Sequence, residues 1–183
     1  MENIDYKSLH LTPEQEDQNI EAAFQDVLNG YLHSNHRKKV EIIKRAYSFA
    51  KEAHKGIRRR SGEPYILHPI AVAKIVSQEI GLGSTSICSA LLHDVVEDTD
   101  MTLEELEKLF PPAVTEGVRL MTHDDSTDYF DYVRRIKGTV AEPVKRADIA
   151  HNSDLSRMDT VTEKDLLRIE KYKKALRILD GEE

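Results

Sequence analysis

The stretch Leu91-Leu92-His93-Asp94-Val95-Val96-Glu97-Asp98 sets one imidazole and three carboxylates within a short apolar segment. In a helix, residues four apart share a face, so His93 would lie beside Glu97 and Asp94 beside Asp98. The apolar neighbours predict that this helix is largely buried, and buried carboxylates are costly unless they are paired or coordinate a cation. The stretch therefore predicts a buried helix with one metal-binding and catalytic face.

Apolar residues recur at helical spacing along almost the whole chain, and the residues between these runs are typical of helix caps rather than of hairpin turns. We therefore predict an all-α fold. The expected caps are Thr12, followed by Pro13 and Glu14; Ser84 or Thr85 for the helix that carries His93; Thr102, opening a capping box; and Thr162, with Asp165 in another. The expected helices cover about 13–32, 34–55, 70–80, a segment from 84 or 85 through the His93 stretch, a segment from 102, and 128–137, 141–155 and 163–179.

The chain has 183 residues, which is enough for one domain with one substantial core. We expect a flexible N-terminus over residues 1–12 and a single domain over 13–183, with its core at about 35–158 and a C-terminal helix at about 163–179. A second catalytic domain would hardly fit in this length. The 26 basic and 33 acidic residues give a net charge of −7, which argues against a general binder of nucleic acid or of an anionic membrane.

The one cysteine, Cys88, excludes an intrachain disulfide and a cysteine-rich zinc site, and it fits a reducing cytoplasm. The N-terminus has no basic segment followed by an apolar one, and no apolar stretch approaches the roughly 20 residues that span a bilayer. We therefore expect a soluble, cytoplasmic protein without a membrane partner. The sequence leaves the oligomeric state open.

His93 and Asp94 supply one adjacent pair of candidate metal ligands. A metal ion in a phosphohydrolase takes a mixed set of imidazole and carboxylate ligands and keeps positions open for water and substrate. His68 precedes Pro69, which fixes the backbone and can begin a helix, so its side chain can supply a third ligand. Asp148 stands among apolar residues and can supply a fourth. Taken alone, His68 is more often a structural histidine, and Asp148 alone can be a helix cap or an ion-pair partner.

Three ordered motifs carry a resemblance to a known family. They are Arg59-Arg60-Ser61-Gly62-Glu63-Pro64-Tyr65-Ile66-Leu67-His68-Pro69, then His93-Asp94-Val95-Val96-Glu97-Asp98-Thr99, then Val144-Lys145-Arg146-Ala147-Asp148 with Asn152. Together they resemble the hydrolase domain of Rel/SpoT enzymes, which degrade the alarmone (p)ppGpp. Because no synthetase domain would fit in this length, the chain is similar to the small alarmone hydrolases, such as the metazoan SpoT homologue. The resemblance implies the all-α helical bundle of the HD superfamily.

The resemblance also implies a metal centre and a reaction. One Mn²⁺ ion would be held by His68, His93, Asp94 and Asp148. Glu97 and Asp98, which by themselves can equally be the solvated acidic end of a helix, would orient and deprotonate the attacking water. The implied enzyme is a guanosine-3′,5′-bis(diphosphate) 3′-pyrophosphohydrolase, which hydrolyses the 3′-diphosphate of (p)ppGpp to GDP or GTP and pyrophosphate without a covalent enzyme intermediate.

Lys55 and the run from Arg58 to Arg60 form a basic cluster, and guanidinium groups both pair with phosphates and stack on planar bases. The resemblance places Arg59 and Ser61 near the nucleotide base and matches Asn152 to a position that contacts the nucleotide. The expected substrate-binding residues are Lys55, Arg59, Arg60, Ser61 and Asn152. By spacing alone, Asn152 can also be a surface amide. His151 can be a group that supports a metal ligand, but it is expected to be an ordinary helix residue and is not counted among the ligands.

The segment after Asn152 departs from the family pattern, because Asp154 stands where many relatives carry a cation. Arg157, three residues on, lies on nearly the same helical face and can take over a phosphate contact. Two alternative functions therefore stay open. One is hydrolysis of another nucleotide, such as an adenine alarmone, the 2′-phosphate of NADPH or a nucleoside monophosphate. The other is a catalytically silent nucleotide-binding regulator, against which the intact pair Glu97 and Asp98 argues.

Overall fold

The computed structural model describes residues 11–36, 38–124, 126–156 and 160–182, and this part of the chain is built from helices, as predicted. The one β-type pairing among these residues is an isolated bridge between Arg58 and Pro64. In chain order the helices are α1 (Pro13–His33), α2 (Val40–Ala53), α3 (Leu67–Lys74), the π-helical turn η1 (Ile75–Glu79), α4 (Ser84–Leu92), α5 (Val95–Asp98), α6 (Leu103–Leu109), α7 (Pro112–Met121), α8 (Tyr129–Ile136), α9 (Glu142–Ser153) and α10 (Glu163–Asp180).

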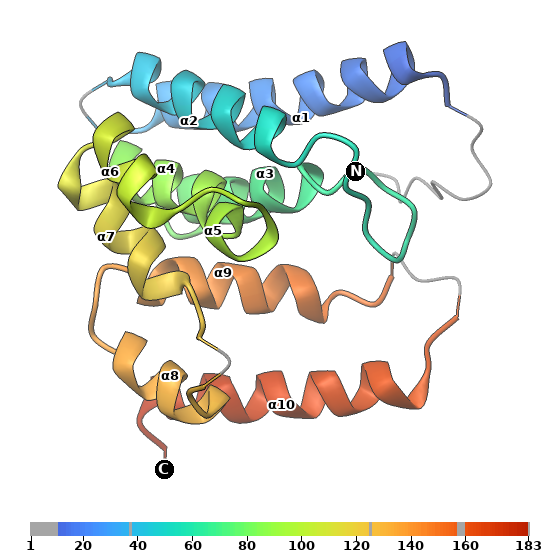
Figure 1. The fold of residues 1–183 in the computed structure, drawn as a ribbon, viewed down its shortest axis with the longest axis vertical. Helices are drawn as coiled ribbons and strands as arrows, with labels where there is room; N and C mark the ends of the chain where they lie inside the picture. The colour runs from blue at the N-terminus through green and yellow to red at the C-terminus, as the bar shows by residue number, and fades with distance from the viewer. Residues whose placement is uncertain (1–10, 37, 125, 157–159, 183) are drawn as a thin grey trace.

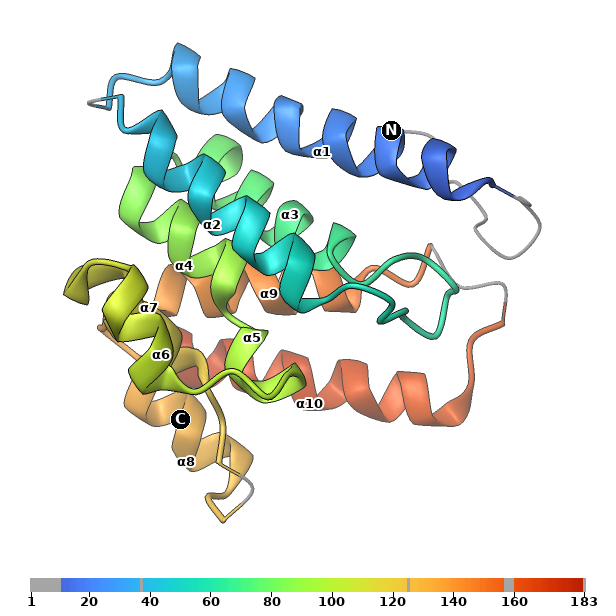
Figure 2. The ribbon, with the colours of Figure 1, turned by 45° about the horizontal axis from the view of Figure 1, so that its top comes forward.

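The helices lie in successive tiers. Figure 1 shows α1 and α2 on one side of the molecule, α3 and α4 next to them, then α9, and α10 with α8 on the opposite side. Figure 2 shows the same order from another direction, with α9 between the α3 and α4 tier and α10. Helices α3, α4 and α9 are therefore central, and each is covered by neighbours on more than one side.

Helix α4 is central because, after its first turn of Ser84 to Ser86, it has no exposed face. Its last six residues, Ile87 to Leu92, are all buried. A helix of this kind has no solvent face and is stable only when other helices surround it. Helices α2, α3, α7, α9 and η1 do so. His93 and Asp94, which follow α4 in the chain, therefore lie near the middle of the molecule.

The predicted cap at Thr12 and the predicted capping boxes at Thr102 and Thr162 are confirmed, and the structure shows that Thr12 also forms a capping box. Thr12 caps α1 with Gln15, Thr102 caps α6 with Glu105, and Thr162 caps α10 with Asp165. The predicted loose segment 1–12 falls mostly outside the described residues, since these begin at residue 11. None of the helices in the described ranges has the length and apolar character needed to cross a membrane.

Several predicted helix boundaries were wrong. Helix α2 begins at Val40 rather than at Ser34, because Ser34 ends α1 by donating its backbone N–H and its hydroxyl to the carbonyl of Tyr31. The cap of α4 is Gly83, and Ser84 is its first helical residue. Helix α3 begins at Leu67, three residues before the predicted start, so His68 lies in its first turn.

The predicted single helix through His93 and Asp98 is interrupted. His93 ends α4 and Asp94 caps the short helix α5. Asp94 has φ −96° and ψ −4°, in a sparsely populated region of the backbone map where active-site residues are often found. The backbone N–H of Asp98 still donates to the carbonyl of Asp94 over 2.9 Å, so the chain resumes a helical turn at once.

Candidate functional site

Four predicted metal ligands meet where three helices approach one another. His68 comes from the start of α3, His93 and Asp94 from the junction of α4 and α5, and Asp148 from the middle of α9. Candidate ligand atoms of His68, His93 and Asp94 all lie within 4.8 Å of one another. Oδ1 of Asp148 lies 3.3 Å from Nε2 of His68 and 3.9 Å from Nε2 of His93. We refer to these four residues as the His/Asp cluster.

The His/Asp cluster is buried and its groups are strongly coupled electrostatically. Burial lowers the pKa of His68. Burial also lowers the pKa of His93, but Asp94 and Asp148 outweigh this effect and raise it to about 9. Burial raises the pKa of both carboxyl groups, yet the neighbouring cations hold each below its usual range: His93 acts mainly on Asp94, and Lys145 mainly on Asp148. Both aspartates are therefore ionised at neutral pH.

Each member of the cluster also makes a close polar contact with a group outside the cluster. The two histidines have different partners. Nδ1 of His93 lies 2.8 Å from the backbone carbonyl of Ala90, and Nδ1 of His68 lies 2.7 Å from Nδ1 of His151. Such partners fix the orientation of a metal-binding side chain.

The two aspartates are held by side chains. The hydroxyl of Tyr65 donates to Oδ2 of Asp94 over 2.8 Å. The ammonium group of Lys145 donates to Oδ2 of Asp148 over 3.0 Å, and the amide of Asn152 donates to Oδ1 over 2.5 Å. Oδ1 of Asp148 is also the oxygen nearest to the two histidines, so Lys145 occupies the other oxygen and turns Oδ1 toward the centre.

The residues present fit a divalent metal ion. The carbonyl of Ala90 can only accept a hydrogen bond, so Nδ1 of His93 donates to it and Nε2 is the nitrogen that faces the cluster. That Nε2 is buried and makes no hydrogen bond of suitable geometry, although Asp94 lies 3.1 Å away. Two imidazole nitrogens and two carboxylates form a mixed donor set of the kind that first-row divalent ions accept.

The predicted catalytic pair lies on α5, directly after the cluster. Glu97 accepts a hydrogen bond from the backbone N–H of His123, and burial raises the pKa of Glu97 above its usual value. Glu97 and Asp98 line an open pocket together with Ala53 and Ile57. A carboxylate of raised pKa beside a metal centre is suited to proton transfer.

A pocket of about 260 Å³ contains most of the predicted substrate-binding residues. It is lined by Arg58, Arg59, Arg60, Ser61, Tyr65, Asn152, Asp154 and Arg168. We call it the arginine pocket. Tyr65 belongs both to this pocket and, through its bond to Asp94, to the surroundings of the His/Asp cluster, so the two sites adjoin.

Two of the predicted arginines already have protein partners. The Nη2 group of Arg59 donates to Oδ1 of Asn152 over 2.7 Å, and Arg59 also pairs with Glu63. The Nη2 group of Arg60 donates to Oδ2 of Asp165 over 2.5 Å and so joins the loop before α3 to α10. Arg59 is turned toward the cluster, whereas Arg60 is turned toward the outer helix.

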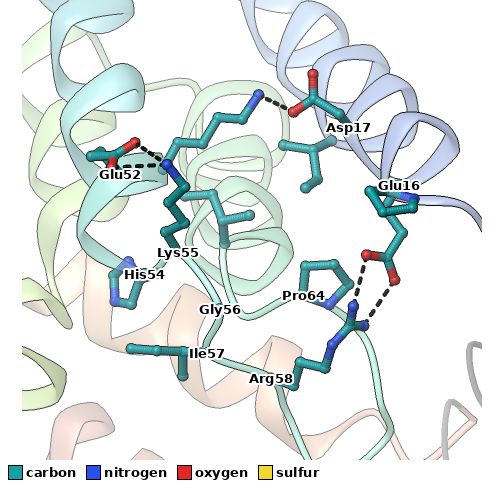
Figure 3. A pocket seen from close by; sticks show the side chains of 13 residues that line it. Glu16, Asp17, Glu52, His54, Lys55, Gly56, Ile57, Arg58 and Pro64 are labelled. Carbon is teal, nitrogen blue, oxygen red and sulfur yellow. Dashed lines mark hydrogen bonds and ion pairs between the residues drawn. The ribbon is translucent and has the colours of Figure 1, made fainter.

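Lys55 lies in a different pocket from the other four predicted substrate-binding residues. Figure 3 shows this second pocket, of about 500 Å³, between the start of α1, the end of α2 and the loop that follows. Lys55 pairs there with Glu52, and the guanidinium of Arg58 pairs with Glu16 through two hydrogen bonds. The charged groups of this pocket are largely neutralised by one another.

Sequence reasoning missed the supporting residues Tyr65, Lys145 and Arg168. The prediction that His151 is an ordinary helix residue was wrong, because its ring lies against that of His68 with 4.9 Å between centroids. Its position three residues after Asp148 puts it on the same helical face, which was the available signal. The predicted phosphate contact of Arg157 lies outside the described residues.

Comparison with known proteins agrees with this geometry. The family model described as HD domain matches residues 46–148. A guanosine-3′,5′-bis(diphosphate) 3′-pyrophosphohydrolase of Aquifex aeolicus is 38% identical over 148 residues, which are 78% of this chain and 20% of that protein. The bifunctional (p)ppGpp synthase/hydrolase SpoT of Escherichia coli K12 is 42% identical over 92 residues, which are 50% of this chain and 13% of that protein. The chain thus spans a fifth or less of the length of these curated relatives.

A solved structure is similar over most of both chains. It belongs to a metazoan orthologue of SpoT described as hydrolysing ppGpp and acting in starvation responses. It has a TM-score of 0.70 and 28% sequence identity, and the match covers 80% of this chain and 89% of that one. The matched HD model, the curated relatives and this structure agree with one another: the chain belongs to the HD domain family and, within it, is of the Rel/SpoT type.

Proposed function

We propose that this protein is a metal-dependent (p)ppGpp 3′-pyrophosphohydrolase that releases pyrophosphate and leaves GDP or GTP. The observation that carries the proposal is the position of the His/Asp cluster next to the arginine pocket, with Tyr65 belonging to both. A phosphate ester bound by arginines in that pocket could present its scissile bond to the cluster. The names of the Aquifex and Escherichia relatives and of the metazoan structure support this substrate.

The proposed cofactor is one Mn²⁺ ion, held by His68, His93, Asp94 and Asp148. When bound, such an ion activates water and neutralises phosphate charge. In the proposed reaction Glu97 is the general base that takes the proton from the attacking water, and its raised pKa brings it closer to the working pH. Asp98 orients the same water.

The proposed substrate contacts lie in the arginine pocket. Arg59, Arg60 and Ser61 come from the loop before α3, and Asn152 comes from α9, so the nucleotide would bridge two segments far apart in the sequence. Arg168 of α10 adds a further cation that pairs with phosphate. Lys55 is proposed as an outer contact, because it lies in the neighbouring pocket.

Another nucleotide is the second candidate substrate, and one observation favours keeping it. Asp154 brings a carboxylate into the arginine pocket, and a carboxylate disfavours a closely bound phosphate group. NADPH or a nucleoside monophosphate would place fewer or differently arranged phosphates there, whereas an adenine alarmone differs from ppGpp only in its base.

The test is product analysis with purified protein and Mn²⁺ on ppGpp, pppGpp, ppApp, NADPH and nucleoside monophosphates, with Asp94→Ala as the blank. We expect pyrophosphate and GDP from ppGpp, and no product with the variant. Turnover of a different nucleotide alone would replace the substrate and keep the reaction class. Absence of turnover for every substrate would contradict the proposed enzyme.

A further inference from the structure

A direct contact between two histidine rings lies behind the His/Asp cluster. Nδ1 of His68 and Nδ1 of His151 are 2.7 Å apart, and the rings are inclined by only 30°. A hydrogen bond between two ring nitrogens needs one proton, so one nitrogen donates and the other accepts. The direction of this bond decides which nitrogen of His68 carries its proton.

Arg59 decides the direction of the bond. Its Nη1 group lies 3.3 Å from the same Nδ1 of His151. A guanidinium group has only donors and does not lose its proton in proteins. A proton on Nδ1 of His151 would point at these donors, so that nitrogen must hold a lone pair. It therefore accepts from His68 over 2.7 Å, with the Arg59 guanidinium facing the same lone pair at 3.3 Å, and Nδ1 of His68 carries the proton.

The other nitrogen of His68 is then free to act as a ligand. Its Nε2 holds a lone pair and lies 3.4 Å from Oδ2 of Asp94 and 3.3 Å from Oδ1 of Asp148. A lone pair facing two ionised carboxylates is repulsive until a cation stands between them. The arrangement fixed by Arg59 is therefore the one that a metal ion requires.

We propose that His151 is a positioning residue that holds His68 in its metal-binding tautomer, and that Arg59 in turn fixes His151. The inference rests on the proposed metal-dependent function. It adds that the arginine pocket and the His/Asp cluster are linked, because Arg59 lines the pocket and also bonds Asn152, which donates to Asp148. Both links end on proposed metal ligands.

The test compares two substitutions at one position. His151→Asn keeps an acceptor oxygen near the place of Nδ1 but loses the ring, whereas His151→Phe keeps a ring and loses the acceptor. We expect His151→Phe to weaken Mn²⁺ binding about 10- to 100-fold by titration calorimetry, and His151→Asn to stay within a few-fold of the unsubstituted protein. The matched control is His33→Phe on the exposed side of α1, with unchanged affinity.

A second measurement does not depend on variants that fold. Nitrogen NMR of the protein loaded with Zn²⁺, a diamagnetic ion, should show His68 with its proton on Nδ1 and His151 with its proton on Nε2. The opposite tautomer of His68 would overturn the inference, and so would equal Mn²⁺ affinity of His151→Phe and the unsubstituted protein, or equal weakening by both substitutions. Because the readouts are metal affinity and tautomer, failure to hydrolyse ppGpp would contradict the proposed substrate without affecting this result, whereas a protein that binds no Mn²⁺ would contradict both.

Discussion

At the scale of single residues, the site depends on charges that have been removed from water. The side chains of Lys145 and Asp148 are only 11% and 9% exposed, and they are joined over 3.0 Å. The ammonium group also lies over the rings of Tyr129 and Tyr132. A buried ion pair is not by itself strongly stabilising, but removal of one partner leaves the other charge uncompensated.

We therefore expect Lys145→Met to destabilise the protein by about 3 kcal/mol, because Asp148 would keep its charge without its main cation. Urea unfolding at pH 7 measures this change. The control is Lys55→Met, since Lys55 and Glu52 form a pair of similar spacing whose side chains are 74% and 76% exposed. That substitution should change stability by less than about 0.5 kcal/mol. Equal losses for the two lysines would contradict the importance of burial.

Replacing Glu97 should remove the proposed general base. Glu97→Gln keeps an oxygen that accepts the N–H of His123 but removes the base, so kcat should fall roughly 100- to 10,000-fold while Mn²⁺ affinity stays unchanged. In the unsubstituted protein, burial raises the pKa of Glu97, so activity should decline as the pH falls through this raised value and the base takes up a proton. Rates measured against pH should show the decline. An identical acid limb in Glu97→Gln would assign it to another group.

The sequence could predict the four candidate ligands because each stands in a short motif whose residue types have few other uses together. It could also have indicated that Lys145 and Asn152 support Asp148, since they lie three and four residues from it on one helix. It could not indicate the contact of His68 with His151, 83 residues away, or of Asp94 with Tyr65, 29 residues away. Those contacts depend on how α3, α5 and α9 pack.

At the scale of helices, starts were predictable where a side chain closes the first turn. The capping boxes at Thr12, Thr102 and Thr162 are local, so the sequence contains all the information that they need. The break at His93 and Asp94 contains no proline or glycine and has no local cause. Its cause is tertiary, because Asp94 faces His68 of α3 and His93 faces Asp148 of α9.

Helix α10 carries a prediction about acid stability. Asp165 is 1% exposed, accepts from Thr162 in the capping box and pairs with Arg60, and these contacts lower the pKa of its carboxyl group. A carboxyl with a lowered pKa in the folded protein contributes stability above its ordinary pKa near 4, and this contribution is lost as the pH falls below it.

Asp165→Asn should therefore lower the melting temperature at pH 7 and have progressively less effect between about pH 4 and pH 2. Thermal unfolding followed by circular dichroism across this range measures the difference. Arg60→Gln should lower the melting temperature in the same direction and be less than additive with Asp165→Asn, because the two residues share one ion pair. A loss for Asp165→Asn that stays constant down to pH 2 would mean that its charge contributes nothing.

At the scale of the whole molecule, the site lies between the two inner tiers. One inner tier is α3 with α4 and the other is α9, and no proposed metal ligand comes from the outer tiers. The His/Asp cluster draws on α3, on the junction of α4 and α5, and on α9, which are also the most covered helices. These three segments are far apart in the sequence, so their relative positions depend on how the helices pack. A ligand that binds all of them at once therefore stabilises the packing of the whole bundle.

Metal binding should therefore raise the stability of the whole bundle. Mn²⁺ at about 100 times its dissociation constant adds roughly 2.7 kcal/mol of stability, which for a chain of this length raises the melting temperature by roughly 5–10 °C. The pKa of His93 is raised to about 9 in the metal-free protein, so metal binding must displace a proton, and the temperature increase should grow from pH 6 to pH 8. Scanning calorimetry with and without Mn²⁺ measures both effects.

Asp94→Ala should remove most of the increase in melting temperature, since it removes one ligand without touching the core packing of α4. A similar increase in that variant would mean that the ion binds elsewhere on the acidic surface, and an increase independent of pH would contradict the displacement of a proton from His93.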